Sequence, residues 1–138
     1  MTTNPIITEL DAARIRELGA RLGHADASLH AVNELMELIT QEAEIVPGAR
    51  IVSDVVTVNS RVTFRDELSG MLNTVTLVYP RDFSISKRRI SVLSPVGRAL
   101  LGRRVGDVAP LDVPGGAERR IRIVELHYQP EASGELTR

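Results

Sequence analysis

The stretch that decides the fold is Ser91-Val-Leu-Ser-Pro-Val-Gly-Arg-Ala-Leu-Leu-Gly-Arg-Arg-Val-Gly-Asp107. Ser94 is typical of a residue that caps a helix, and Pro95 suits the first helical position because an N–H there has no partner inside the helix. Gly102 permits the left-handed conformation that often ends a helix, and Gly106-Asp107 predicts a turn. The stretch therefore predicts a strand end, a short helix and the start of another strand.

Alternating apolar residues on both sides of this stretch predict β-strands. The polar and basic run at 84–89 is typical of a surface loop, and Pro114-Gly115-Gly116 predicts a tight hairpin turn. We expect four or five antiparallel strands around one short amphipathic helix, which is an α+β body. The expected strands cover 56–64 with a bend at 59–60, 71–79, 90–93, 108–113 and 121–128.

The first part of the chain shows the spacing of helices instead. Thr8-Glu9-Leu10-Asp11 resembles a capping box, in which the first residue caps a helix. Ile15, Leu18 and Leu22 then form one apolar stripe, and Gly23 is placed to end the helix.

A second helix is expected to follow, with Asp26 or Ser28 as its cap and Pro47-Gly48 as its end. At ~1.5 Å per residue this helix is about 25 Å long. Two stripes joined by so few residues predict an antiparallel hairpin, a short coiled coil that leans on the body or on another copy. The second stripe consists of Leu29, Val32, Met36, Ile39 and Ala43.

The composition excludes several classes of protein. With 138 residues the chain suits one compact domain, or a smaller domain with an appendage. The absence of cysteine excludes disulfides, thiolate metal sites and a cysteine nucleophile. No apolar run reaches the roughly 18 residues of a membrane span, and the N-terminus lacks the pattern of a signal peptide. We therefore expect a cytoplasmic protein with no membrane partner.

The net charge of −1 conceals a division of the chain. Residues 1–46 hold three arginines and eight acids, and the remainder carries a net charge of +4. The basic residues at 87–89, 103–104 and 119–122 indicate either a patch for phosphates or for an acidic protein, or simply solvated faces.

Few residues carry catalytic or metal-binding chemistry. His24, His30 and His127 are scattered, and Asp26 has no second carboxylate beside it in the segment 23–28. A hard metal ion needs several oxygen ligands, so Asp26 is interpreted as a helix cap. The turn at 114–116 lacks the Lys-Ser/Thr of a phosphate loop. We expect no enzyme activity, no metal, no cofactor and no small-molecule ligand.

The opening stretch resembles the C-terminal signature of the bacterial Gre transcript-cleavage factors. The positions that carry this resemblance are Ser91, Ser94-Pro95-Val96-Gly97, Ala99-Leu100-Leu101 and Gly106-Asp107. Three further stretches are similar to the Rnk branch of the Gre-like proteins, which is named for regulation of nucleoside diphosphate kinase. They are Asp54–Val62, Thr76–Pro80 and Glu125–Ala132.

The resemblance implies a short N-terminal antiparallel helical hairpin over 1–48, an FKBP-like GreA/GreB C-terminal domain over 49–132 and a flexible tail over 133–138. In the FKBP-like fold a curved antiparallel sheet wraps around one helix. A peptidyl-prolyl isomerase of that fold would need an aromatic-lined pocket, which the chain's four scattered aromatic residues match poorly.

The resemblance also implies a function. Gre factors place this domain on RNA polymerase at the rim of the secondary channel, and their longer coiled coil enters the channel with an acidic pair that helps to hold a catalytic Mg²⁺. The residues implied to dock on polymerase are Ser94, Pro95, Gly97 and Arg98, although Ser94 and Pro95 also suit any helix start. In this chain the arm is short and the tip holds Asp26 without a second acid, which argues against transcript cleavage. Asp26 is then expected only to contact a partner at the tip.

These features predict a polymerase-binding regulator that occupies the Gre site close to nucleic acid and competes with Gre factors. The alternative is regulation of nucleoside diphosphate kinase, by direct or indirect action.

Overall fold

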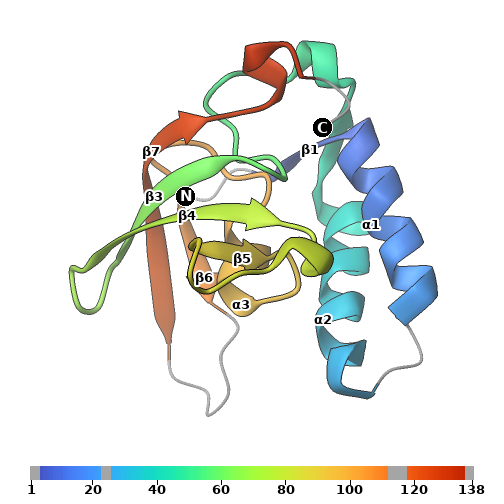
Figure 1. Ribbon diagram of the computed structural model, residues 1–138, viewed down its shortest axis with the longest axis horizontal. Coiled ribbons are helices and arrows are strands. Elements are labelled where there is room, and N and C mark those ends of the chain that lie inside the picture. The colour runs from blue at the N-terminus through green and yellow to red at the C-terminus, as the bar shows by residue number, and fades with distance from the viewer. Residues whose placement is uncertain (1–3, 23–25, 112–117, 136–138) are drawn as a thin grey trace.

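A curled sheet of five strands in the order β5-β4-β3-β7-β6 forms the body of the molecule (Figure 1). The computed structural model describes residues 4–22, 26–111 and 118–135, without the side chains at 22 and 26–29. The predicted α+β class is confirmed. The strands are β3 (Arg61–Asp66), β4 (Leu72–Val78), β5 (Arg89–Ser91), β6 (Val108–Leu111) and β7 (Arg119–Tyr128).

The sheet is mixed, which corrects the prediction of antiparallel strands throughout. β4 is antiparallel to β3, but β5 runs parallel to β4 and pairs with it at Thr76–Val78. Between β4 and β5 the chain makes a 3-10 turn at Pro80–Asp82 and a loop closed by a bridge between Ser84 and Arg89. This connection returns the chain to the same edge of the sheet in the same direction.

The segment before β3 is not a strand, although its apolar residues alternate with polar ones. The three valines between 55 and 58 are buried. The Ser60 N–H donates to the Thr57 carbonyl, and Ser60 Oγ accepts from the Thr57 N–H, both at 3.0 Å. Asn59 inside this turn has φ 73°, a left-handed conformation that Asn tolerates. The alternation therefore marks burial on an irregular segment, and the strand begins at Arg61.

Two helices, α1 (Glu9–Leu22) and α2 (Asp26–Glu37), lie next to each other along one side of the sheet (Figure 1). Thr8 Oγ1 accepts a hydrogen bond from the Asp11 N–H at 3.1 Å, as a residue that caps α1 should. The predicted stop at Gly23, the residue His24 and the predicted turn at 114–116 lie outside the described residues.

The second helix ends earlier than predicted. The α-helical backbone stops at Glu37 and passes into a π-helical turn at Leu38–Glu42, after which Ala43 is extended with φ −83° and ψ 144°. β2 (Glu44–Val46) then pairs in parallel with β1 (Ile6–Thr8). The helical spacing hid this strand because its apolar residues continue the stripe, while their branched side chains also suit a sheet.

One buried aliphatic cluster joins the helices to the sheet and to α3 (Pro95–Leu100). Burying a side chain of this size contributes roughly 1.5–3 kcal/mol. The helical pair therefore leans on the body, which is one of the two predicted arrangements. Members that are 2% exposed or less include Ile15 of α1, Leu35 of α2, Leu77 of β4, Leu100 of α3 and Ile123 of β7. Among the described residues, no helix has both the length and the apolar character needed to cross a membrane.

Candidate functional site

The residues predicted to dock on a partner gather at the start of α3. Ser94 Oγ accepts a hydrogen bond from the Gly97 N–H at 3.0 Å and donates one to the Ser91 carbonyl at 2.7 Å. Pro95 occupies the first turn of the helix, so the predicted cap and helix start are confirmed. Both hydrogen-bonding functions of the Ser94 hydroxyl are thus used inside the protein.

Gly97 permits a close approach of α3 to the preceding strand. A Cβ atom at this position would lie 2.0 Å from the Ser91 carbonyl oxygen, far inside van der Waals contact. The obstacle is a backbone atom, which cannot rotate away as a side chain can. Glycine is therefore required at position 97 by the fold, whether or not a partner touches it.

Pro95 and Arg98 line a groove of about 220 Å³ between α2 and α3. The Arg98 guanidinium donates to the Leu93 carbonyl. The opposite wall carries the carboxylates of Glu34 and Glu42. Because Pro95 and Arg98 are only half-buried, they offer atoms to a partner, and a partner here meets charges of both signs.

Asp26, the predicted tip contact, is the first residue of α2. Its side chain lies outside the described part of the structure. Its contact with a partner stays a prediction.

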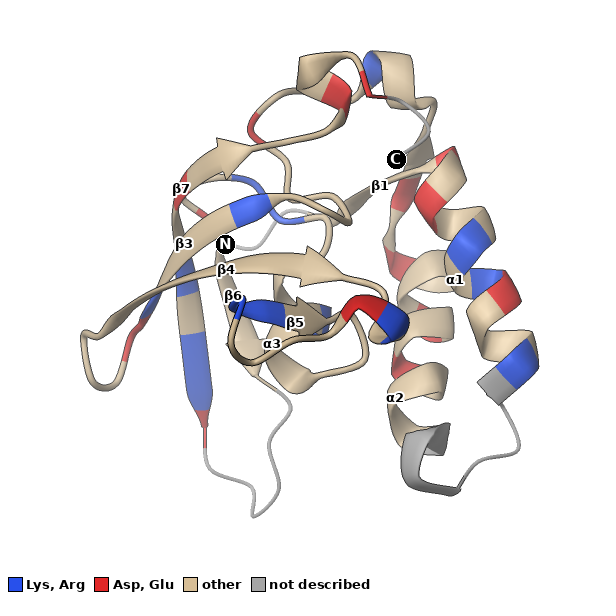
Figure 2. Ribbon diagram, viewed as in Figure 1, with Lys and Arg blue, Asp and Glu red and all other residues tan. Residues whose placement is uncertain are grey.

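The predicted basic residues do not form one patch. Arg104 pairs with Asp54 at 3.2 Å, and Arg122 pairs with Glu67 at 3.0 Å. Arg119 pairs with Asp66, and this hydrogen bond, with two from backbone N–H groups, lowers the pKa of the Asp66 carboxyl. The arginines along β7 are thus largely offset by nearby acids, whereas the charged residues of α2 are acidic (Figure 2).

Lys87 and Arg88 lie in a different place, beside β4. They project from the loop before β5 and, within the described part of the chain, pair with no carboxylate. Arg61 at the start of β3 is also without an acidic partner there, and it lines one groove with Lys87 and Arg88. These three cations are available to a partner.

Asp11, which the sequence indicated only as part of a capping box, is a buried carboxylate that joins α1 to the body. It is 3% exposed, and its carboxylate accepts hydrogen bonds from the Val58 N–H at 3.1 Å and from the Tyr79 hydroxyl at 2.9 Å. Burial raises the pKa of this carboxyl from 3.8 to about 6, against the opposing effect of the two hydrogen bonds. The signal in the sequence was its position on the Ile15–Leu18 stripe, where a charged residue must be buried.

A second buried polar group ties the end of the chain to the segment before β3. The Gln129 side chain donates to the carbonyls of Val52 at 2.8 Å and Val55 at 2.7 Å. Thr57 Oγ1 donates to the Glu131 carboxylate at 2.7 Å. In the described part of the predicted tail, the Glu135 N–H donates to the Pro130 carbonyl at 2.8 Å. These contacts hold the connection between the helices and the sheet.

Within the part of the chain that the structure describes, no cluster of three or more His, Asp or Glu side chains could hold a metal ion.

Residues 51–128, which include the sheet, α3 and the segment before β3, match the family described as "Transcription elongation factor, GreA/GreB, C-term". The chain belongs to the GreA/GreB family. It is 40% identical over 131 residues to the "Regulator of nucleoside diphosphate kinase" of Escherichia coli K12, which covers 94% of this chain and 93% of that protein.

Two further relatives extend the comparison. The "Transcription inhibitor protein Gfh1" of Thermus thermophilus is 35% identical over 98 residues, covering 70% of this chain and 60% of that protein. A solved structure of a "Prokaryotic transcription elongation factor GreA/GreB from Nitrosomonas europaea" is 42% identical, with a TM-score of 0.69 over 90% of this chain and 99% of that one. The GreA/GreB C-terminal fold implied by the sequence is confirmed.

Proposed function

We propose that this protein is a non-catalytic transcription regulator that binds RNA polymerase at the rim of the secondary channel and competes there with Gre factors. The observation that carries the proposal is the complete Gre signature, folded with Ser94 and Pro95 at the start of α3, in a chain that belongs to the GreA/GreB family. Ser94, Pro95, Gly97 and Arg98 form the docking segment. Gly97 acts by shaping the loop, since it is buried.

The short hairpin supports the absence of cleavage activity. α2 has 12 residues and is about 18 Å long at ~1.5 Å per residue. Its residues Val32 and Leu35 are buried, Val32 beside Gly19 of α1 and Leu35 in the core cluster, so they are not available to a partner. The tip segment 23–28 supplies one carboxylate, Asp26, where the Gre mechanism uses an acidic pair. A relative named as a transcription inhibitor is consistent with binding that blocks rather than cleaves.

The finer description of the fold belongs to the same proposal. We regard α1 and α2 as a short coiled coil over 1–48, the body over 49–132 as FKBP-like, and 133–138 as a tail. A cytoplasmic location, with no cofactor, follows from the proposed partner.

Capture of core RNA polymerase on immobilised protein tests the docking segment. Pro95→Ala and Arg98→Gln should each weaken capture several-fold because they remove the exposed atoms of the loop, whereas Arg16→Ala on the exposed side of α1 should leave it unchanged. Thermal unfolding of each variant separates lost contacts from lost folding. Capture that is unaffected by both loop variants would place the interface elsewhere.

A cleavage assay on stalled transcription complexes tests the proposed competition. The protein alone should release no RNA fragment, and it should slow cleavage by added GreA in proportion to its concentration. Intrinsic cleavage, or full GreA activity at saturating protein, would contradict the proposal.

The kinase relationship gives a second candidate function. The 40% identity over 94% of the chain to a protein named as a regulator of nucleoside diphosphate kinase favours it. Co-purification with that kinase from polymerase-depleted lysate, together with a change in kinase activity, would support direct action.

A further inference from the structure

β4 is only half covered on the side that faces β5. β5 pairs with it at Thr76–Val78, and within the described residues the remaining part, Leu72–Val75, has no strand beside it on that side. The cause is local. The Arg88 residue just before β5 has φ 54°, so the chain turns away from the edge instead of continuing along it.

The free backbone groups on this edge can be assigned from the strand's two-residue period. The Thr76 N–H donates to the Arg88 carbonyl and the Val92 N–H donates to the Val78 carbonyl, so even-numbered residues face the β5 side. The Leu77 N–H donates to the Ser60 carbonyl on the β3 side. It follows that Leu72 and Thr74 direct their N–H and C=O groups to the open edge.

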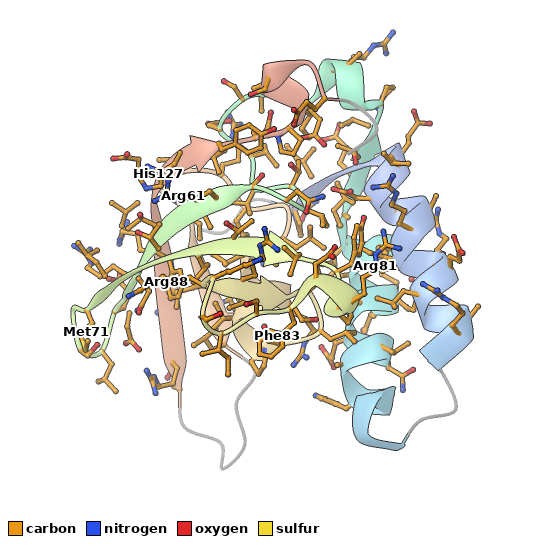
Figure 3. The ribbon with its side chains drawn as sticks, viewed as in Figure 1. Arg61, Met71, Arg81, Phe83, Arg88 and His127 are labelled. Atoms are coloured by element: carbon orange, nitrogen blue, oxygen red, sulfur yellow. The ribbon has the colours of Figure 1, made fainter. Side chains whose placement is uncertain are left out.

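A groove of about 530 Å³ lies across β4 beside this edge, lined from β3 on one side and from the loop before β5 on the other. Three cations line it: Arg61 on the β3 side of β4, and Lys87 and Arg88 on the β5 side. Figure 3 labels Arg61 and Arg88. Among the residues that line it there is no acid to offset them and no aromatic ring. The other lining residues are Leu72, Thr74, Val75 and Thr76.

We propose that the open edge of β4 at Leu72–Val75 binds an extended acidic segment of a partner protein, which adds to the sheet as a further strand. Unpaired strand edges accept peptides through main-chain hydrogen bonds. Lys87, Arg88 and Arg61 select Glu or Asp side chains along the incoming strand. This site goes beyond the proposed polymerase contact and uses none of its residues.

The same features favour a peptide over a single-stranded nucleic acid. Single strands bind through phosphate contacts combined with bases stacked on aromatic rings. This groove supplies the cations without the rings, and it supplies main-chain groups at a strand edge that a nucleic acid backbone does not match. Its threonine-rich lining also suits a β-strand.

Fluorescence anisotropy with a labelled probe tests the proposal on the full chain. The probe is an acetylated and amidated peptide of four Val-Glu repeats. Its matched control has the same sequence and charge, with the backbone N–H groups methylated on the edge that pairs. We expect the methylated peptide to bind at least about tenfold more weakly, since it cannot form the main-chain hydrogen bonds. Equal binding of the two peptides would overturn the proposal.

Two sets of variants locate the site. Thr74→Pro removes an N–H on the open side, where an edge strand tolerates proline, and should weaken binding about tenfold. Thr74→Val keeps the backbone and should bind within about twofold of the wild type. Lys87→Gln with Arg88→Asn should weaken binding about fivefold at low salt and flatten its salt dependence.

A uridine octamer serves as the competing class of ligand. If it binds more tightly than the peptide, or if Thr74→Pro in a folded protein has no effect, the edge is a general polyanion surface and the proposal is wrong. If Thr74→Pro fails to fold, the comparison of the two peptides still decides the outcome.

Discussion

The Ser91–Asp107 stretch turns most of its polar groups toward its own backbone. The edge of β4 at Leu72–Val75, in contrast, leaves backbone N–H and C=O groups facing outward. In the first region, the Ser94 hydroxyl and the Arg98 guanidinium bond to neighbouring backbone groups. In the second, Leu72 is 60% exposed, and within the described residues this part of β4 has no strand beside it on the side that faces β5.

This comparison shows that the residues that identify the family are not the groups left free to bind a partner. In the signature stretch a strand, a cap and a helix meet within a few residues, which restricts each position. The open edge depends on charge and on backbone groups, so many sequences could provide it. Substitutions should therefore damage folding in the first region and binding in the second.

Gly97→Ala should have the largest effect on stability. The new Cβ would overlap the Ser91 carbonyl oxygen, and we expect a loss of about 4 kcal/mol or more in the free energy of unfolding. Urea denaturation measures it. Gly19→Ala is the control, since its Cβ would meet the flexible Met36 side chain at 3.2 Å and should change stability by no more than about 1 kcal/mol. Equal stability of the two variants would show that the strand and α3 are not held so closely.

Asp11 should make stability depend on pH. Its carboxyl has a pKa of about 6 in the folded protein against an ordinary 3.8, so the folded state holds the proton more tightly. The stabilisation is complete below pH 4 and is lost as the pH rises through 6, an effect of about 3 kcal/mol. Asp66, whose pKa is lowered, acts in the opposite sense.

The comparison of wild type with Asp11→Asn isolates this effect, because Asp66 is common to both. Asparagine can accept from the Val58 N–H and donate to the Tyr79 hydroxyl, so the variant should be the more stable protein at pH 7.5 and lose that advantage near pH 4. Denaturation curves at the two pH values check it. A constant difference would mean that the Asp11 carboxyl titrates normally.

Ser94→Ala should cost about 1 kcal/mol, the usual effect of removing a helix cap. Ser94→Thr keeps the hydroxyl and should cost less. Differential scanning calorimetry on both variants measures the difference. If alanine is neutral, the Gly97 N–H finds another partner and the loop is less constrained than its hydrogen bonds indicate.

Leu72→Lys should have the smallest effect on folding, within about 0.5 kcal/mol, because the side chain is mostly in solvent. The same variant adds a cation to the groove at the β4 edge, so it should strengthen binding of the Val-Glu peptide. A large loss of stability would show that the edge is part of the folded core, and would remove the contrast with Gly97.

Local features of the fold could be predicted from the sequence. The cap at Ser94 and the helix start at Pro95 depend on neighbouring residues alone, and the alternation of β4 is visible in its own seven residues. The parallel direction of β5 was missed because it depends on how the intervening loop returns. The strand β2 was missed because its partner, β1, precedes both helices in the sequence whereas β2 follows them.

The polar contacts of the sites were harder to predict for the same reason. Asp11 meets Val58 and Tyr79 across 47 and 68 residues of sequence, and no spacing rule connects such positions. The open edge of β4 depends on the left-handed conformation of Arg88. Residues other than glycine rarely adopt this conformation, so the sequence does not predict it. The basic residues can be recognised in the sequence, but the fold decides which of them pair with acids.

The position of β7 in the sheet has a consequence for biosynthesis. β7 is the last strand of the described chain, yet it lies between β3 and β6, and its Ile123 pairs with Phe64 of β3. A ribosome adding about 5–20 residues per second takes roughly 3–12 seconds to make the 60 or so residues between them. During that interval β5 is also made and can pair with β4, so β3, β4 and β5 can form a three-stranded sheet, while the edge of β3 that later takes β7 stays bare. The five-stranded sheet is therefore complete only after β7 has been made.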